Sequence, residues 1–149
     1  MSLPLSGIKV VEICQVLSGP FAAMLLADQG ADVIKIEPPE GDSARRLVPN
    51  YPETNGLSLG YLTFNRNKRS IVVDLSKPKG LALVHEILKD ADVLLMAMRT
   101  KTRERRGLSY EDVAALNPRL IYLSLTGFGE KGPEADQPGI DIVTQARVG

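Results

Sequence analysis

Clusters of basic side chains are the feature of this sequence that points most directly to chemistry. The segment 99–106, RTKTRERR, holds four arginines and one lysine against a single acid, a net charge of +4 over eight residues. Lys68 and Arg69 form a second basic point earlier in the chain. Guanidinium and ammonium groups make charge-assisted hydrogen bonds to phosphates, so the two clusters together predict a site for a phosphorylated ligand. A solvated loop without a ligand is the alternative for each of them.

An acidic residue and a helix start are further candidates for ligand binding. Glu37 ends a predicted strand near the spacing at which dinucleotide-binding enzymes place the carboxylate that binds a ribose hydroxyl. The G-x-G-x-x-G fingerprint is missing from the preceding turn, so an NAD site rests on this one residue. Gly19 and Pro20 begin a predicted helix whose first N–H groups can bind an anion. Proline removes one of those donors, and a simple helix entry is the alternative.

Nucleophilic and metal-binding side chains are scarce. Cys14, the single cysteine, lies at the end of a predicted strand, where we expect a small core residue rather than a nucleophile. His85 is the single histidine, and we expect it to be packed or exposed rather than to act as a base. No spacing of side chains predicts a metal site, and no Ser-His-Asp arrangement is predicted.

The elements that must position these residues alternate between strand and helix. Residues 9–13 are a short β-branched run typical of a buried strand, a helix is predicted from Pro20 to Gly30, and a second strand follows at 31–37. The same rules predict helix 78–90, strand 93–96, helix 109–116 and strand 120–125. The alternation predicts an α/β fold, a Rossmann-like parallel sheet with flanking helices. Because ligands bind at the carboxyl edge of such sheets, the site is expected at residues 14–19, 37–42 and 96–106.

Three segments interrupt this alternation. The polar segment 40–59 contains several prolines and glycines and is predicted to be a long surface loop. Two short extended pieces are predicted to flank the basic turn NRNKR at 65–69. The apolar segment 140–149 follows a glycine- and proline-rich stretch, and a helix starting there would have little to pack against. We therefore expect further chain to complete the fold.

The totals exclude several classes of protein. A chain of 149 residues suits one compact domain, and 18 basic and 18 acidic side chains cancel, so no global field points to nucleic acid. The apolar runs are far below the roughly 20 residues that cross a bilayer, so no membrane partner is predicted. A single cysteine fits a reducing compartment, and we predict a cytoplasmic protein.

Five blocks of the sequence, in order and in spacing, resemble the amino-terminal part of the class III coenzyme A transferases. The group includes formyl-CoA and carnitine-CoA transferases and the α-methylacyl-CoA racemases. The blocks are PLSGIKVVEICQVLSGPFAAMLLADQGADVIKIEPPEGDSARR, FNRNKRSIVVDLSKPKG, ADVLLMAMR, RERRGLSYEDVAALNPRLIYLSLTGFGEKGP and PGIDIVTQA. They cover essentially the whole chain, so the resemblance is far more specific than any one motif.

The resemblance implies that the first βαβ unit holds coenzyme A, as a substrate and not as a tightly bound cofactor. It places the thioester end of CoA against the turn after the first strand, formed by Gln15, Val16, Leu17 and Ser18. It places the adenosine end along Val73 and the adjacent Ser76 and Lys77. The pyrophosphate and the 3′-phosphate would then be met by scattered side chains rather than by a glycine loop.

The resemblance also suggests which basic residues meet phosphates. Arg105 matches the arginine of the family's E-R-x-G block and is implied to contact a phosphate. Lys68 and Arg69 match the N-K-R-S block, which fits either a phosphate-facing or a structural role.

The sequence departs from the family pattern at three places. The family usually has E-N-F-R-P-G where this chain has MAMRTK at 96–101, so the aromatic and amide neighbours of adenine are replaced and Met98 is left to pack on the purine. Leu17 stands where formyl-CoA transferases carry glutamine, which disfavours that substrate. Ile140 stands where the racemases carry their catalytic histidine, before Asp141, which sets the racemase function below the transferase function.

The resemblance implies a transferase that moves CoA between carboxylic acids. An aspartate accepts the acyl group as a mixed anhydride and then carries CoA as a thioester, which splits the exchange into easier steps. In the family this aspartate follows the PGIDIVTQA block, so it is expected beyond Gly149, and no catalytic residue is predicted within the chain. Residues 1–149 would be the amino-terminal CoA-binding part of the large Rossmann-like domain, with the second domain absent.

Several alternatives stay open at this point. The resemblance implies an interlocked homodimer that acts on an acyl-CoA and a carboxylic acid, whereas the 149 residues alone are predicted to be inactive. A shortened relative that keeps only a CoA pocket, or only a dimerisation surface, is the second hypothesis. An NAD-binding Rossmann protein is the third.

Overall fold

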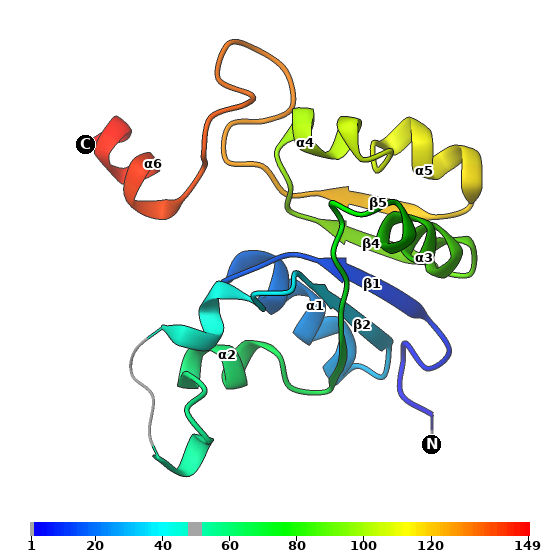
Figure 1. Cartoon of the computed structure of the whole chain (residues 1–149). Coiled ribbons are helices and arrows are strands. Elements are labelled where there is room, and N and C mark those ends of the chain that lie inside the picture. The colour runs from blue at the N-terminus through cyan, green and yellow to red at the C-terminus, as the bar shows by residue number, and fades with distance from the viewer. Residues whose placement is uncertain (1, 48–51) are drawn as a thin grey trace.

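The computed structural model describes residues 2–47 and 52–149, and in this part the chain forms a five-stranded parallel sheet (Figure 1). The strand order is β3-β2-β1-β4-β5, the order of a Rossmann fold. The strands are β1 (Lys9–Ile13), β2 (Asp32–Glu37), β3 (Lys68–Val72), β4 (Val93–Met96) and β5 (Ile121–Ser124). All four neighbouring pairs are parallel, with Val11 of β1 opposite Ile34 of β2 and Leu94 of β4.

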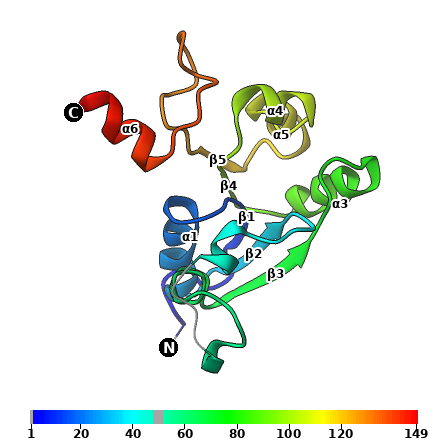
Figure 2. The ribbon, with the colours of Figure 1, turned by 60° about the vertical axis from the view of Figure 1, so that its left-hand side comes forward.

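Helices cover both faces of the sheet (Figure 2). Helix α1 (Ser18–Asp28) lies on one face, with the short α2 (Leu59–Phe64) beside it. Helices α3 (Pro78–Lys89) and α5 (Tyr110–Leu116) lie on the other face and contact each other. The remaining helical pieces are α4 (Thr100–Arg105), which follows β4, α6 (Asp141–Val148), and two 3₁₀ turns at Ser43–Arg46 and Pro52–Thr54.

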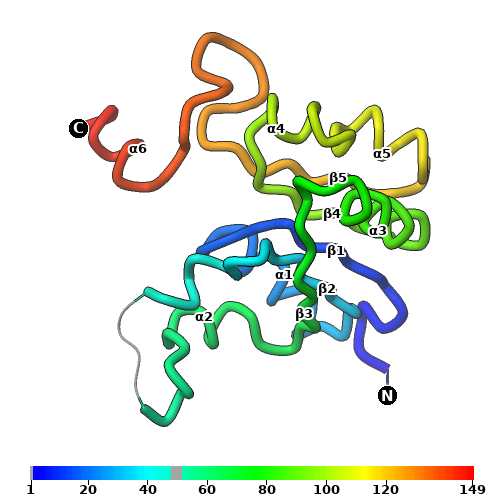
Figure 3. Tube along the Cα trace, in the orientation of Figure 1, coloured from blue at the N-terminus to red at the C-terminus, as the bar shows by residue number. Residues whose placement is uncertain are grey.

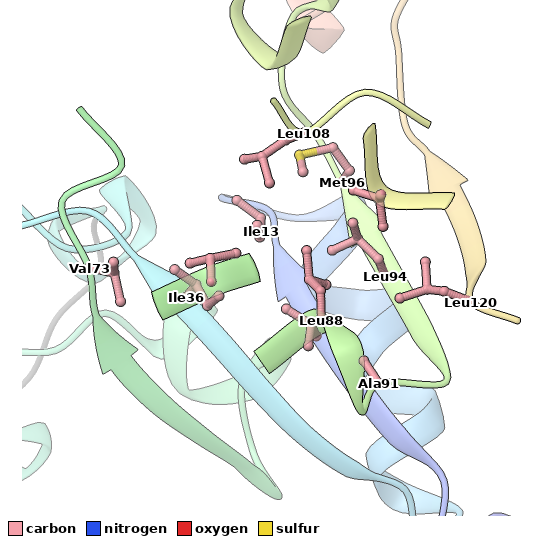
Figure 4. Close-up of a cluster of buried hydrophobic side chains, with 12 residues drawn as sticks. Ile13, Ile36, Val73, Leu88, Ala91, Leu94, Met96, Leu108 and Leu120 are labelled. Atoms are coloured by element: carbon pink, nitrogen blue, oxygen red, sulfur yellow. The ribbon is translucent and has the colours of Figure 1, made fainter. Parts of the chain in front are cut away.

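The alternation of side chains along the strands divides the core into two clusters. On β1, Val11 and Ile13 point towards α3 and α5, whereas Val10 and the following Cys14 point towards α1. The larger cluster, drawn in Figure 4, joins these β1 residues to Leu94 and Met96 of β4 and to Leu88 of α3. Most of the buried side chains in the cluster under α1 are small, among them Ala23 and Ala27 of the helix itself.

The predicted fold class and most of the predicted elements are confirmed, and two segments have a different structure from the predicted one. The first extended piece before the basic turn is instead helix α2, because the Ser58 hydroxyl accepts a hydrogen bond from the Tyr61 N–H (3.0 Å) and Phe64 packs edge-to-face on Phe21 of α1 (5.9 Å between ring centroids). The charge run at 99–106 is largely helix α4 rather than a loop. Of the predicted loop at 40–59, residues 48–51 lie outside the described residues.

The far end of the chain stands apart from the sheet. Helix α6 lies away from the other helices in both views (Figures 1 and 2), and its Ile142 and Val148 are 71% and 79% exposed. Before it, residues 128–138 form a loop whose two ends meet, because Gly127 and Gly139 touch through their backbones. The Cα trace shows this loop in orange, between β5 and α6 (Figure 3).

Candidate functional site

A cavity of about 450 Å³ opens at the carboxyl edge of the sheet. Its lining comes from the residues that end or follow four strands, among them Gln15 after β1, Pro38 after β2, Val73 after β3 and Met98 after β4. Strands β2 and β4 lie on either side of β1. The chain therefore adds β2 and β3 on one side of β1 and then β4 and β5 on the other, which makes the β1–β4 junction a topological switch point. Such a switch point is where open α/β sheets bind ligands, and the cavity lies within the usual volume range of small-molecule sites.

The cavity has an apolar floor and a few charged groups at its rim. Arg106, at the end of α4, is the cation of the lining, and its Nη1 lies 3.7 Å from the Met98 sulfur. Glu40 and Asp74 supply carboxylates. Hydrogen bonds from the Ser76 hydroxyl (2.6 Å) and backbone N–H (2.8 Å) lower the pKa of Asp74. The apolar lining suits an apolar or aromatic part of a ligand, and Arg106 is the group of the lining that could bind an anionic part.

The residues expected along the adenosine and phosphate end divide between the cavity and the surface. Val73 and Ser76 line the cavity, whereas Lys77 is exposed and outside the lining. Arg105 is exposed on α4, and its Nε donates a hydrogen bond to the Lys101 carbonyl (3.2 Å). The structure therefore brings Arg106, and not its neighbour Arg105, to the cavity.

The residues expected at the thioester end form the turn between β1 and α1. Gln15 lines the cavity, and Val16, Leu17 and Ser18 follow as exposed residues of the turn and the start of α1. Val16 has a φ of 68°, in the left-handed region that a β-branched residue rarely adopts. The turn is therefore held in an unusual backbone conformation at the edge of the cavity.

The structure does not bring Lys68 and Arg69 to the cavity. The Lys68 side chain is 1% exposed, and its ammonium group donates hydrogen bonds to Glu12 Oε2 (2.7 Å) and to the carbonyl of Pro20 in α1 (2.8 Å). Arg69 forms an exposed ion pair with Asp32 (2.7 Å) at the other end of β2. Of the two roles that the N-K-R-S block suggested, these contacts correspond to the structural one.

Four buried charges form a continuous chain under the turn, which we call the buried ion chain: Lys68, Glu12, Lys35 and Asp42. Lys35 Nζ lies 2.9 Å from Glu12 Oε1 and 2.8 Å from Asp42 Oδ2. Burial opposes the protonation of Lys35, but Glu12 and Asp42 outweigh it and raise the pKa of the ammonium group. Burial lowers the pKa of Lys68 in spite of Glu12. Two cations and two anions compensate one another, as buried charges require.

The Glu37 carboxylate is occupied by hydrogen bonds from other residues of the protein. It does not face the cavity, as a ribose-binding carboxylate would. It is 1% exposed and accepts two hydrogen bonds from Arg45 (2.7 Å each) and one each from Tyr61 (2.9 Å), Ser70 (2.6 Å) and the Asp42 N–H (2.9 Å). Burial acts against its ionisation, yet these donors lower the pKa of Glu37 to about 2. The carboxylate thus fixes the segment after β2.

Cys14 and His85, the remaining candidates, have the burial and the contacts of structural residues. Cys14 is 2% exposed, and burial, together with Glu12, raises the pKa of its thiol to about 12. His85 Nε2 is hydrogen-bonded to the Gly107 carbonyl (2.9 Å). In residues 2–47 and 52–149 no cluster of His, Cys, Asp and Glu could hold a metal ion. No helix in the same ranges is long and apolar enough to span a membrane.

Sequence reasoning missed the buried ion chain as part of the site. Its signal was present, because Glu12 and Lys35 each stand inside an apolar strand, in VVEIC and DVIKIE. A charged residue in the middle of a buried strand needs a partner of opposite sign. What the sequence did not show is the register of β1 against β2, which places Glu12 directly opposite Lys35.

Comparison with known proteins identifies the family. The family described as CoA-transferase family III matches residues 5–149. The chain is 48% identical to the succinate–glutarate CoA-transferase of Agrobacterium fabrum, over 98% of this chain and 38% of that protein. It is 42% identical to the cinnamoyl-CoA:phenyllactate CoA-transferase of Clostridium sporogenes, over 91% and 34%. The chain thus spans less than two fifths of these relatives.

Solved structures agree with this result. A CaiB/BaiF family protein from Brucella suis superimposes with a TM-score of 0.92 at 40% identity, over 99% of this chain and 39% of that one. A short-chain dehydrogenase/reductase family protein superimposes with a TM-score of 0.50 at 14% identity, which reflects the shared Rossmann-like fold alone. The chain belongs to CoA-transferase family III and corresponds to the amino-terminal part of its members.

Proposed function

We propose that the cavity at the carboxyl edge of the sheet binds coenzyme A, and that the chain is the CoA-binding part of an enzyme that moves CoA between carboxylic acids. The observation that carries the proposal is the position of the cavity at the switch point of the sheet in a member of this family. Its lining by Val73, Met98 and Arg106 on one side and Gln15 on the other supports it further.

The proposed orientation of CoA follows from the chemistry of the lining. Val73 and Met98 offer apolar surface to the adenine ring, and the Arg106 guanidinium offers charge-assisted hydrogen bonds to a phosphate. The arm of CoA then runs along the strand ends towards Gln15, so the thioester reaches the turn after β1. Arg106 takes the phosphate role in this arrangement, because Arg105 lies outside the cavity lining.

The acyl transfer itself belongs to the whole protein in this proposal. The covalent route through an aspartate needs a carboxylate at the thioester end, and the family pattern expects it beyond residue 149. We therefore expect the 149-residue chain to bind CoA without turnover, as the CoA-binding part of a larger Rossmann-like domain. The complete protein is proposed to be a cytoplasmic homodimer that takes an acyl-CoA and a carboxylic acid as substrates.

Calorimetric titration of the 149-residue chain with CoA tests the binding proposal. Arg106→Ala is expected to weaken CoA binding by about 10- to 100-fold, because a hydrogen bond to a charged group contributes roughly 1.5–3 kcal/mol. Arg105→Ala is the matched control one residue away and should change the affinity by less than about twofold. Absence of heat with CoA, or a larger loss in Arg105→Ala, would contradict the proposed site, and heat with NAD would favour the dinucleotide alternative.

An exchange assay tests the catalytic proposal. A longer form of the protein that extends past residue 149 should transfer CoA from an acyl-CoA to at least one acid of a carboxylic-acid panel. If CoA binds but no acid is converted, the non-catalytic CoA-binding module becomes the better description.

A further inference from the structure

The geometry points to the Lys35–Asp42 ion pair as a clamp that positions Gln15 and the left-handed Val16 at the cavity. In this inference Lys35 and Asp42 are positioning residues, which act on the ligand only through the backbone of the turn. The inference rests on the proposed function, because it takes the ligand of the cavity to be CoA.

The two residues of the clamp form hydrogen bonds to the backbone on both sides of Gln15. The Lys35 ammonium group donates a hydrogen bond to the Cys14 carbonyl (3.0 Å), immediately before Gln15. The Val16 N–H, immediately after it, donates to Asp42 Oδ1 (3.1 Å). Lys35 Nζ and Asp42 Oδ2 are 2.8 Å apart, so one ion pair holds both backbone groups that flank the cavity-lining residue.

The clamp is rigid because its members are buried and fixed by further bonds. Lys35 and Asp42 are 1% and 0% exposed. Asp42 Oδ1 also accepts the Ala44 N–H (2.9 Å), and the Asp42 N–H donates to Glu37 (2.9 Å). Lys35 in turn pairs with Glu12 (2.9 Å). A displaced turn would leave charged groups without partners, which is costly in a buried site.

Val16 shows that the clamp holds the turn against a backbone preference. A β-branched residue disfavours the left-handed region, whereas glycine occupies it freely. The side chain of Val16 is 45% exposed, so packing of that side chain is not what keeps the residue there. Strained backbone persists where the surroundings over-determine it, and such places cluster at ligand sites.

The test compares CoA affinity, measured by calorimetry, in four forms of the chain: the wild type, Asp42→Asn, Val16→Gly and the double variant. Asparagine cannot serve both sides of the clamp, because its amide presents a donor either to Lys35 or to the Val16 and Ala44 N–H groups. We expect Asp42→Asn to weaken CoA binding by about 10-fold or more, since small misplacements at a site have large effects. Val16→Gly alone supplies the reference affinity for the double variant, because Val16 itself belongs to the turn that the proposal places at the thioester.

Rescue in the double variant is the decisive readout. Glycine at position 16 adopts the left-handed conformation without the clamp, so the double variant should recover most of the affinity that Asp42→Asn loses. A merely structural role for Asp42 predicts no recovery, because a second substitution in an exposed turn cannot repair a broken buried ion pair. Val113→Ala, in the core under α5, is the control: it should lower stability and leave CoA affinity unchanged.

Each outcome decides the inference. Unchanged affinity in Asp42→Asn overturns it, and so does a double variant that binds no better than Asp42→Asn. A wild-type chain that does not bind CoA contradicts the proposed function, and this inference with it. Normal CoA binding in the wild type without rescue contradicts the clamp alone.

Discussion

At the scale of single residues, the structure explains how charged side chains can be buried under α1. Glu12, Lys35 and Glu37 all point to the face of the sheet that α1 covers, and each is at most 1% exposed. Their partners include Arg45, eight positions from Glu37, and two more distant residues: Tyr61, 24 positions from Glu37, and Lys68, 56 positions from Glu12. The polar contacts therefore join β1, β2 and β3 to the segment after β2, and the loss of one partner should be felt as a loss of stability.

Glu37 gives a prediction for stability against pH. The folded-state pKa of about 2 lies below the ordinary value of 4.5, so the ionised carboxylate stabilises the fold fully above about pH 4.5. That contribution is lost as the pH falls towards 2, and it is on the order of 3 kcal/mol for this shift. We expect Glu37→Gln to lower the free energy of unfolding by about this amount at pH 7, as measured in urea.

The difference between Glu37→Gln and the wild type should shrink as the pH falls from 4.5 towards 2. Glu104→Gln, at an exposed carboxylate on α4, is the control and should leave stability nearly unchanged. A constant difference between pH 7 and pH 3 would show that Glu37 contributes through packing and not through its charge.

At the scale of elements, the start of α1 packs against the end of β1 so closely that no side chain fits between them. A Cβ atom added at Gly19 would lie 2.3 Å from the Cys14 Cβ and 2.4 Å from its sulfur. Gly19→Ala should therefore push α1 away from the sheet and destabilise the chain by about 1–3 kcal/mol, measured by chemical unfolding.

The control for Gly19→Ala is the same substitution in another helix. Gly60 lies inside α2, and the nearest atom to an added Cβ is the Ser58 hydroxyl oxygen at 3.8 Å. Gly60→Ala should stabilise the chain by about 0.5–1 kcal/mol, because alanine is the better helix former. If both variants were equally stable, the close contact at Gly19 would not be limiting.

Elements with a continuous apolar run or a strong local cap were predictable from the sequence, and short elements fixed by tertiary contacts were not. Strand β4 is a continuous apolar run, VLLM, and α5 begins with a capping box between Ser109 and Asp112. The six residues of α2 depend on Phe21, 43 positions before Phe64.

The site was predictable in its location and less so in its members. The rule that ligands bind at the carboxyl edge selects the strand ends that line the cavity, including Gln15 and Val73. The rule does not say whether Arg105 or Arg106 faces the cavity, because that depends on the rotation of helix α4 about its own axis. Nor does it show that Lys68, a basic residue at a strand start, points beneath α1 to Glu12.

At the scale of the whole molecule, one face of the sheet is incompletely covered. Ile121 and Leu123 of the edge strand β5 are 65% and 42% exposed, and Phe21 and Leu25 of α1 are 44% and 45% exposed. Exposed apolar side chains favour association when a second copy can cover them. The 149-residue chain is therefore expected to self-associate as its concentration rises, as measured by light scattering after size-exclusion chromatography.

Replacing the apolar pair on β5 tests this expectation. Ile121→Thr/Leu123→Thr should shift the association midpoint to a concentration at least about threefold higher, because apolar area is removed from the contact. Val72→Thr is the control: Val72 is 64% exposed, at the opposite edge of the sheet on β3. Equal behaviour of the two variants would contradict an association through the β5 side.

The meeting of Gly127 and Gly139 has a practical consequence for engineering. Because the two backbones touch, we expect that the loop between them can change in length without moving the two glycines apart, provided that its ion pairs to Lys101 and Arg103 of α4 are kept. An epitope tag or a fluorophore grafted between these glycines should leave the cavity at the carboxyl edge of the sheet intact, whereas an alanine at either glycine would force the two backbones apart.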